Sequence, residues 1–174
     1  MEISQFVADS PWAQMVGSPS RGIPAPSVQV FLATAAPIVE AEKERAVRAK
    51  LRRKQTETAE DPMAEEYRLW MEDNHVSQIV LAVRLAPNAG LATESEVRKM
   101  EEESYMQVGK RKVKMTGHFP PTKSDPHLRM AFPRMEPGDE KTVTFAIYVP
   151  GLPLPFREVV FKLKDMVLNG KLEL

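Results

Sequence analysis

The sequence predicts an α+β fold: a mostly antiparallel β-sheet or β-sandwich of about six or seven strands, with three short-to-medium helices. Apolar residues alternate with polar or small ones from Lys141 to Val149, and again from Val159 to Lys164. Side chains on a strand point alternately to opposite faces, so both segments indicate strands with one face toward a core. Fifteen prolines divide the 174 residues into short segments, which favours strands and rigid loops over a helical bundle.

The strongest turn signal is Asn169-Gly170, near the end of the chain. A two-residue type I′ turn needs a positive φ at both central positions, which Asn and Gly accept best. The turn predicts that Leu168 lies opposite Lys171, and that the C-terminal segment is held against the sheet. Asp165 falls on the apolar face of the preceding strand. Either a bulge or the sheet edge turns Asp165 to water, or it is a buried carboxylate that marks a site.

The N-terminal part, residues 1–26, is expected to contain a short helix over 2–8 and a Pro/Gly/Ser-rich loop over 17–26. Trp12, between them, is expected to anchor this segment on the core. Residues 27–174 are expected to form a single α+β domain, beginning with an alternating strand over 27–33.

A charged, partly exposed helix and linker are expected over 37–60. Pro37 fits the first turn of a helix that runs to about residue 55, where acids and bases recur at helical pair spacing. The run from Arg48 to Lys54 holds five bases and no acid. Such a run could contact nucleic acid, but an acidic segment follows at residues 57–66, so the favoured interpretation is a solvated helix. No nucleic-acid partner is expected.

Two further helices and a central strand follow. Asp61-Pro62 is a helix start, and the helix to residue 72 carries a core-facing stripe that includes Tyr67 and Trp70. Residues 79–85 are almost continuously apolar, which indicates a strand covered on both faces. A turn over 87–90 closes this strand, and a capping box of Thr93 and Glu96 starts a helix over 93–104.

Residues 105–115 are expected to form a strand with a bulge at Gly109. The apolar residues on the two sides of Gly109 have opposite parity, and a bulge would return them to one face. Lys110, Lys112 and Lys114 would then line one outer face. They could bind an anionic partner, but charged edges also block unwanted strand pairing, and this second interpretation is favoured. A short strand is expected over 128–132.

The candidate site is a set of possible metal ligands, His118, Asp125 and His127, which flank the proline-rich loop 117–126. Loops held on a rigid sheet often carry function, and this set could bind a divalent metal ion. No fourth ligand is evident. Ser124 lies beside Asp125, but no nucleophile elbow accompanies it. The chain has no phosphate-binding or dinucleotide-binding motif, so no cofactor is expected, and without cysteine it can form no disulfide.

Five segments resemble a family of uncharacterised bacterial proteins: DSPWAQ (9–14), EYRLWMED (66–73), PPTKSDPHLRMAFPR (120–134), VPGLPLPFREVVF (149–161) and KDMVLNGKLEL (164–174). No activity is assigned to this family, so no functional residue can be transferred. Its members often carry a secretion or lipoprotein signal. The resemblance therefore implies an exported or envelope-associated protein, although residues 1–14 have neither the basic leader nor the apolar stretch of a signal peptide.

Two functions are compatible with these observations. The first is a non-enzymatic structural or protein-interaction module of the bacterial cell envelope, with an unknown protein partner. The second is a divalent-metal-binding protein or metal-dependent hydrolase that uses His118, Asp125 and His127. No apolar run approaches the roughly 20 residues needed to span a bilayer, so no transmembrane segment is expected.

Overall fold

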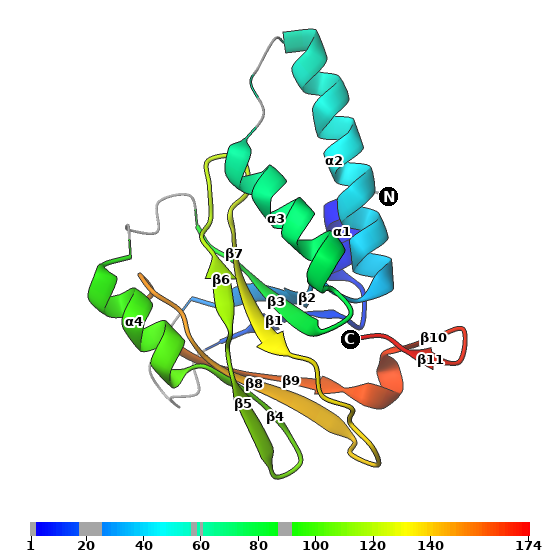
Figure 1. The fold of residues 1–174 in the computed structure, drawn as a ribbon, viewed down its shortest axis with the longest axis vertical. Coiled ribbons are helices and arrows are strands. Elements are labelled where there is room, and N and C mark those ends of the chain that lie inside the picture. The colour runs from blue at the N-terminus through cyan, green and yellow to red at the C-terminus, as the bar shows by residue number, and fades with distance from the viewer. Residues whose placement is uncertain (1–2, 18–25, 57–58, 60, 87–91) are drawn as a thin grey trace.

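Two antiparallel β-sheets pack face to face, and helices cover the outer face of the larger sheet (Figure 1). The computed structural model describes residues 3–17, 26–56, 59, 61–86 and 92–174. The larger sheet has the strand order β1-β2-β3-β7-β6, and the smaller sheet has the order β5-β4-β8-β9. The predicted fold class, an α+β fold with a mostly antiparallel sandwich, is confirmed.

The strands are more numerous than predicted because several are very short. The larger sheet contains β1 (Ala13–Val16), β2 (Val28–Leu32), β3 (Gln78–Arg84), β6 (Gly117–Phe119) and β7 (His127–Pro133). The smaller sheet contains β4 (Tyr105–Val108), β5 (Arg111–Lys114), β8 (Thr142–Tyr148) and β9 (Phe156–Lys162). A separate hairpin joins β10 (Val167–Leu168) to β11 (Lys171–Leu172). Strands of two to four residues are too short to show a clear alternation of apolar and polar residues.

The helices are α1 (Ile3–Ala8), α2 (Ala36–Thr56), α3 (Pro62–Asn74) and α4 (Glu94–Glu103), with a 3₁₀ turn η1 at Leu163–Asp165. The three longer helices match the predicted ones within two residues at each end. Asp61 caps α3 by accepting a hydrogen bond from Met63 N, and both halves of the Thr93–Glu96 capping box are present. In Figure 1, α1, α2 and α3 lie over one face of the larger sheet, and α2 continues well beyond the sheet.

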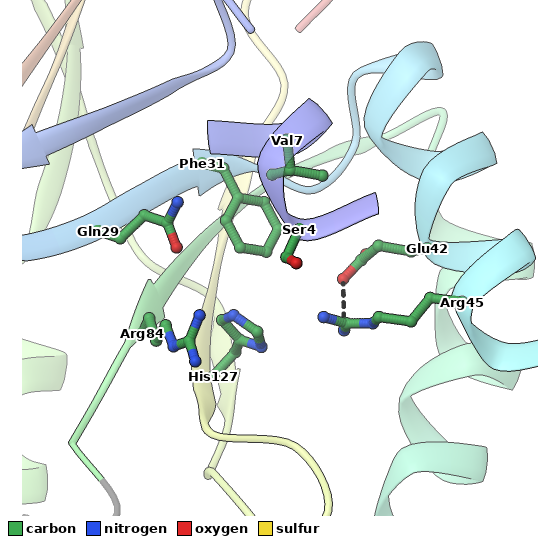
Figure 2. Close-up of a pocket in the computed structure, with 8 residues that line it drawn as sticks. All are labelled: Ser4, Val7, Gln29, Phe31, Glu42, Arg45, Arg84 and His127. Atoms are coloured by element: carbon green, nitrogen blue, oxygen red, sulfur yellow. Dashed lines mark ion pairs between the residues drawn. The ribbon is translucent and has the colours of Figure 1, made fainter. Parts of the chain in front are cut away.

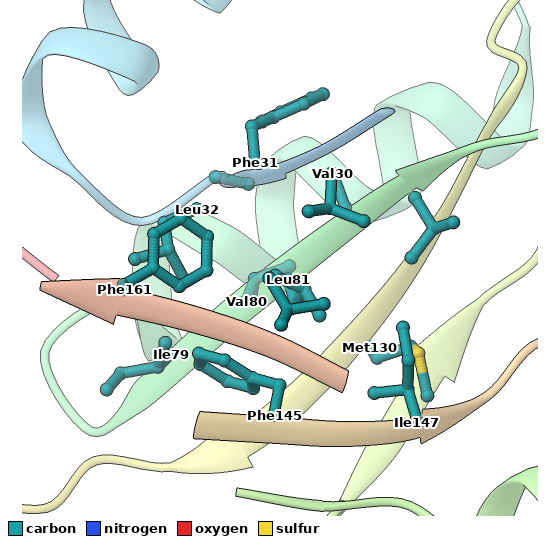
Figure 3. Close-up of a cluster of buried hydrophobic side chains, with 14 of the residues drawn as sticks. Val30, Phe31, Leu32, Ile79, Val80, Leu81, Met130, Phe145, Ile147 and Phe161 are labelled. Atoms are coloured by element: carbon teal, nitrogen blue, oxygen red, sulfur yellow. The ribbon is translucent and has the colours of Figure 1, made fainter. Parts of the chain in front are cut away.

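Most of the core lies between the two sheets (Figure 3), and its remaining buried residues, such as Phe31 and Ile38, lie between the larger sheet and the helices. Phe145 of β8 is its centre: its ring centroid lies 5.3 Å from that of Phe132 and 6.0 Å from that of Phe161. Inward and outward residues alternate strictly along β9, as the sequence pattern predicts.

The C-terminal hairpin forms as predicted. Asn169 and Gly170 both have positive φ, 52° and 78°, and Leu168 pairs with Lys171. Trp12 Nε1 donates a hydrogen bond of 2.8 Å to the Glu173 carbonyl, and Arg134 donates one of 3.0 Å to the Leu174 carbonyl. These bonds hold the C-terminal segment against the sandwich and anchor Trp12, which is buried.

Three sequence-based expectations need correction or completion. The predicted bulge at Gly109 is wrong, because residues 105–114 form two strands joined by a hairpin turn. Gly109, with φ 59°, is the first residue of this two-residue turn, and Val108 pairs with Arg111 across it. Glycine at the first turn position is the type II′ pattern. Asp165 is exposed, at the end of η1. Residues 13–16, expected within the N-terminal helix and loop, form the edge strand β1. Most of the predicted loop 17–26 and the whole turn 87–90 lie outside the described residues.

Candidate functional site

A charged residue lies in the centre of the helix-covered face of the larger sheet. Along β7, Leu128, Met130 and Phe132 point into the sandwich, so Arg129 between them points toward the helices. Only 3% of Arg129 is exposed. A guanidinium at this depth is tolerated only if carboxylates and hydrogen bonds satisfy it.

Three elements supply partners to the terminal nitrogens and the face of the Arg129 guanidinium, whereas its buried Nε–H has no hydrogen-bond partner. Its Nη1 and Nη2 donate to both carboxylate oxygens of Glu42 on α2, at 3.2 and 2.7 Å. Its Nη2 also donates to Asp125 Oδ2 at 3.2 Å, and its Cζ lies 4.2 Å from the ring centroid of Tyr67 on α3. We call these four residues, Glu42, Tyr67, Asp125 and Arg129, the Arg129 cluster. The cluster ties α2 and α3 to the sheet.

Asp125 is itself fixed by its neighbours. His127 Nδ1 lies 2.5 Å from Asp125 Oδ1, so the ring N–H donates to the carboxylate. The Asp125 backbone N–H donates to Thr122 Oγ1 at 3.1 Å, and Thr122 Oγ1 donates to Asp61 Oδ2 at 2.5 Å. Since Asp61 also caps α3, the loop before β7 and the start of α3 are held by one chain of hydrogen bonds.

The charges of the cluster are stabilised by one another. Burial raises the pKa of Asp125, but the hydrogen bond from His127 and the charge of Arg129 outweigh burial, so the pKa lies well below its usual range. Burial lowers the pKa of Arg129, but the carboxylate of Glu42 reverses this effect and keeps the pKa above its usual value. Burial raises the pKa of Tyr67, which stays neutral at physiological pH. At neutral pH the cluster therefore holds an ionised Asp125 and an ionised Arg129 next to a neutral Tyr67.

A small hollow lies beside the cluster (Figure 2). Its volume is about 20 Å³, and it is lined by Ser4, Val7, Gln29, Phe31, Glu42, Arg45, Arg84 and His127. His127 is 5% exposed and packs edge-on against Phe31, with the ring centroids 5.1 Å apart. A hollow of this size holds about one water molecule, so it has no room for an organic substrate.

The structure separates the three residues predicted to bind metal. His118 of β6 pairs in register with Met130, which faces the sandwich, whereas His127 faces the helices. His118 Nδ1 lies 3.6 Å from Glu101 of α4, and only Asp125 and His127 touch each other. In the part of the chain that the structure describes, no group of three or more His, Asp or Glu side chains could hold a metal ion.

The residues that matter most around Asp125 were missed by sequence reasoning. Ser124 donates its hydroxyl to Asp61, so it supports the cap of α3. Glu42 lies among the acids and bases at helical pair spacing that predicted a solvated helix, and besides Arg129 it pairs with Arg45 at 3.5 Å. One feature of the sequence could have indicated the cluster: Arg129 is a charged residue within the otherwise apolar strand 128–132.

Comparison of the chain with protein-family models, with curated proteins and with solved structures finds no match. Within the described residues, no helix combines the length and the apolar character that a membrane span requires.

Replacing Arg129 by methionine should destabilise the protein by about 3–5 kcal/mol, because the partly buried carboxylates of Glu42 and Asp125 lose their counterion. The matched control is Arg68→Met, which removes an exposed arginine paired with Glu65 and Glu72. The control should cost far less, because ion pairs exposed to solvent contribute little to stability. Urea denaturation of both variants measures the difference, and equal costs would contradict a stabilising role for the Arg129 cluster.

The low pKa of Asp125 predicts a pH dependence. Its ionised form stabilises the fold above the pKa of an unfolded aspartate, about 3.9, and this contribution is lost as the pH falls below that value. Asp125→Asn should therefore have a lower unfolding free energy than the wild type at neutral pH. Its stability should also decline less between about pH 4 and pH 2. Denaturation at several pH values tests this, and parallel profiles for the two proteins would show that Asp125 is not the linked group.

Proposed function

We propose that this chain is a non-enzymatic protein-interaction module that presents helix α2 to an acidic protein partner. The observation that carries the proposal is an exposed apolar pair on a helix that is fixed at its base and projects from the domain (Figure 1). An envelope location is proposed with it, supported by the resemblance of the five segments described above.

The two ends of α2 have very different surroundings. Near its start, Ile38 is fully buried and Ala41 is 7% exposed, and Glu42 pairs with Arg129. None of residues 42–56 is buried. The helix is therefore anchored over its first two turns. Its remaining turns contain no buried residue, and there Arg45 and Arg48 pair with Glu42 and Glu44 of the same helix.

The exposed part of α2 carries an apolar stripe. Val47 and Leu51 are 59% and 57% exposed, and residues four apart lie on the same face of a helix. Single exposed aliphatic residues are common, but two that are one turn apart on a projecting helix form a contact surface. Burying one such side chain completely stabilises a complex by roughly 1.5–3 kcal/mol.

The charge around the stripe indicates an acidic partner. Residues 45–56 include six bases and no acid: Arg45, Arg48, Lys50, Arg52, Arg53 and Lys54. Complementary charge speeds association and selects the partner, while the apolar pair supplies affinity. Because the Arg129 cluster already fixes the base of α2, binding requires little further ordering of the helix.

An acidic protein with an apolar groove fits this surface better than nucleic acid does. Nucleic acid would use the basic side chains but would leave Val47 and Leu51 without a role. The Arg129 cluster does not support an enzymatic role. The adjoining hollow accommodates about one water molecule, and the charged groups of the cluster pair with one another.

Photo-crosslinking in cells of the source organism tests the proposal. Benzoylphenylalanine placed at Leu51 should capture one acidic protein, because the partner packs against this face of α2. The matched control is the same probe at Val76, which is 72% exposed but lies beyond the end of α3. Val47→Asp should abolish the adduct at position 51, and 0.5 M salt should weaken it.

Three outcomes would contradict the proposal. They are no adduct at position 51, equal adducts at positions 51 and 76, and an adduct at position 51 that nuclease removes. The last result would identify nucleic acid as the ligand of the basic helix.

A further inference from the structure

The two edge strands of the smaller sheet present different side chains to solvent. β5 carries Arg111, Lys112 and Lys114, and charged residues of this kind block pairing with other strands. The opposite edge strand, β9, has no proline, and its Phe156 and Val160 are 51% and 40% exposed. The edge strand β5 thus carries positive charge only, whereas β9 combines exposed apolar side chains with one exposed acid, Glu158, and one exposed base, Lys162.

The direction of the free backbone groups on β9 follows from one hydrogen bond. Gln14 Nε2 donates to the Val160 carbonyl at 2.9 Å, so this carbonyl points away from β8. In an antiparallel pair, alternate residues direct their N–H and C=O groups to the same side. Glu158, Val160 and Lys162 therefore offer their backbone groups outward. The amide of Gln14 takes the place that the N–H of a further strand would occupy.

Open space adjoins the C-terminal half of this edge. A broad, open hollow of about 460 Å³ lies between β1 and β9, and Gln14, Val160 and Lys162 are among the residues that line it. Within the described residues, β8 is the only strand that pairs with β9. A further strand would have to displace the side chain of Gln14 from the Val160 carbonyl, and near the start of β9 it would approach Pro26, whose carbonyl accepts a hydrogen bond from Arg157.

We propose that β9 pairs with β9 of a second copy of this chain, antiparallel across a two-fold axis at Val160. Two four-stranded sheets would then join into one continuous sheet. Such a contact is isologous, so the strand must be complementary to itself. Glu158 and Lys162 lie two residues on either side of Val160. The pairing sets each Glu158 opposite Lys162 of the second copy, with the two Val160 side chains in contact.

The charges also select this register over its neighbours. Moving the axis by two residues, to Glu158, places two glutamates opposite each other, which is unfavourable. Moving it by one residue, to Val159, places Glu158 opposite Val160 and leaves the charges without cross-strand partners. Cross-strand pairs of opposite charge stabilise a sheet, and the register at Val160 forms two of them.

The affinity should be modest. β9 has seven residues, and an interface made mainly by one edge strand falls at the small end of the protein–protein range, below about 1,200 Å². We expect a concentration-dependent dimer with micromolar to millimolar affinity. The proposal does not depend on α2, so Val47→Asp should leave the dimer unchanged.

Sedimentation equilibrium between about 10 μM and 1 mM, at low salt, tests the proposal with charge-swap variants. Glu158→Lys and Lys162→Glu should each weaken the dimer at least tenfold, because each variant places like charges opposite each other twice. The double variant restores both pairs with reversed sign, and it should return the affinity to within about threefold of the wild type. Glu158 and Lys162 are exposed in each copy, so the variants should retain their fold, and circular dichroism checks this.

Hydrogen exchange gives a second readout, since the backbone amides of Glu158, Val160 and Lys162 should become more protected as the concentration rises. Lys112→Glu on the β5 edge is the matched control and should leave the dimer unchanged. A protein that stays monomeric at 1 mM would overturn the proposal. A dimer that survives both single charge swaps, or that the double variant fails to restore, would overturn it as well.

Discussion

The buried guanidinium of Arg129 is the interaction on which the arrangement of the helices depends. It lies on a strand whose other face packs into the sandwich, and its partners come from α2, from α3 and from the loop that precedes β7. An aliphatic contact at this depth would hold helices and sheet together with less specificity. The guanidinium of Arg129 donates hydrogen bonds to two carboxylates in a fixed geometry. Only one position of α2 satisfies this geometry, because a shifted helix would leave the buried charge of Arg129 without its partner.

Much of the sandwich could be predicted from the sequence because its signals are local. Alternation along β8 and β9, the capping residues Asp61 and Thr93, and the Asn169-Gly170 turn each act within a few residues, and each appears where expected. Gly109 shows where local reasoning fails. A bulge and a two-residue hairpin turn both explain why the apolar residues before and after Gly109 fall on opposite parities. Only the pairing of the strands distinguishes the two structures.

The candidate site was less predictable because it depends on tertiary contacts. Glu42 and Arg129 are 87 residues apart, and nothing near Glu42 in the sequence distinguishes it from the exposed acids of the same helix. His118 and His127 both adjoin the proline-rich loop, yet the register of β6 against β7 sends their side chains to opposite faces of one sheet. A shift of that register by one residue would have brought them to the same face.

The exposed part of α2 and the free edge of β9 belong to separate elements of one rigid scaffold. A dimer through β9 would carry two copies of α2, and a partner able to engage both would bind more tightly than one helix allows. The rigidity of α2 on its base is central to this account, and spin-label distance measurements test it most directly. The chain has no cysteine, so Arg52→Cys and Thr142→Cys introduce labels at these two exposed positions only. The account predicts one narrow distance distribution that broadens in Glu42→Ala; a distribution that is already broad, or one that Glu42→Ala leaves unchanged, would contradict it.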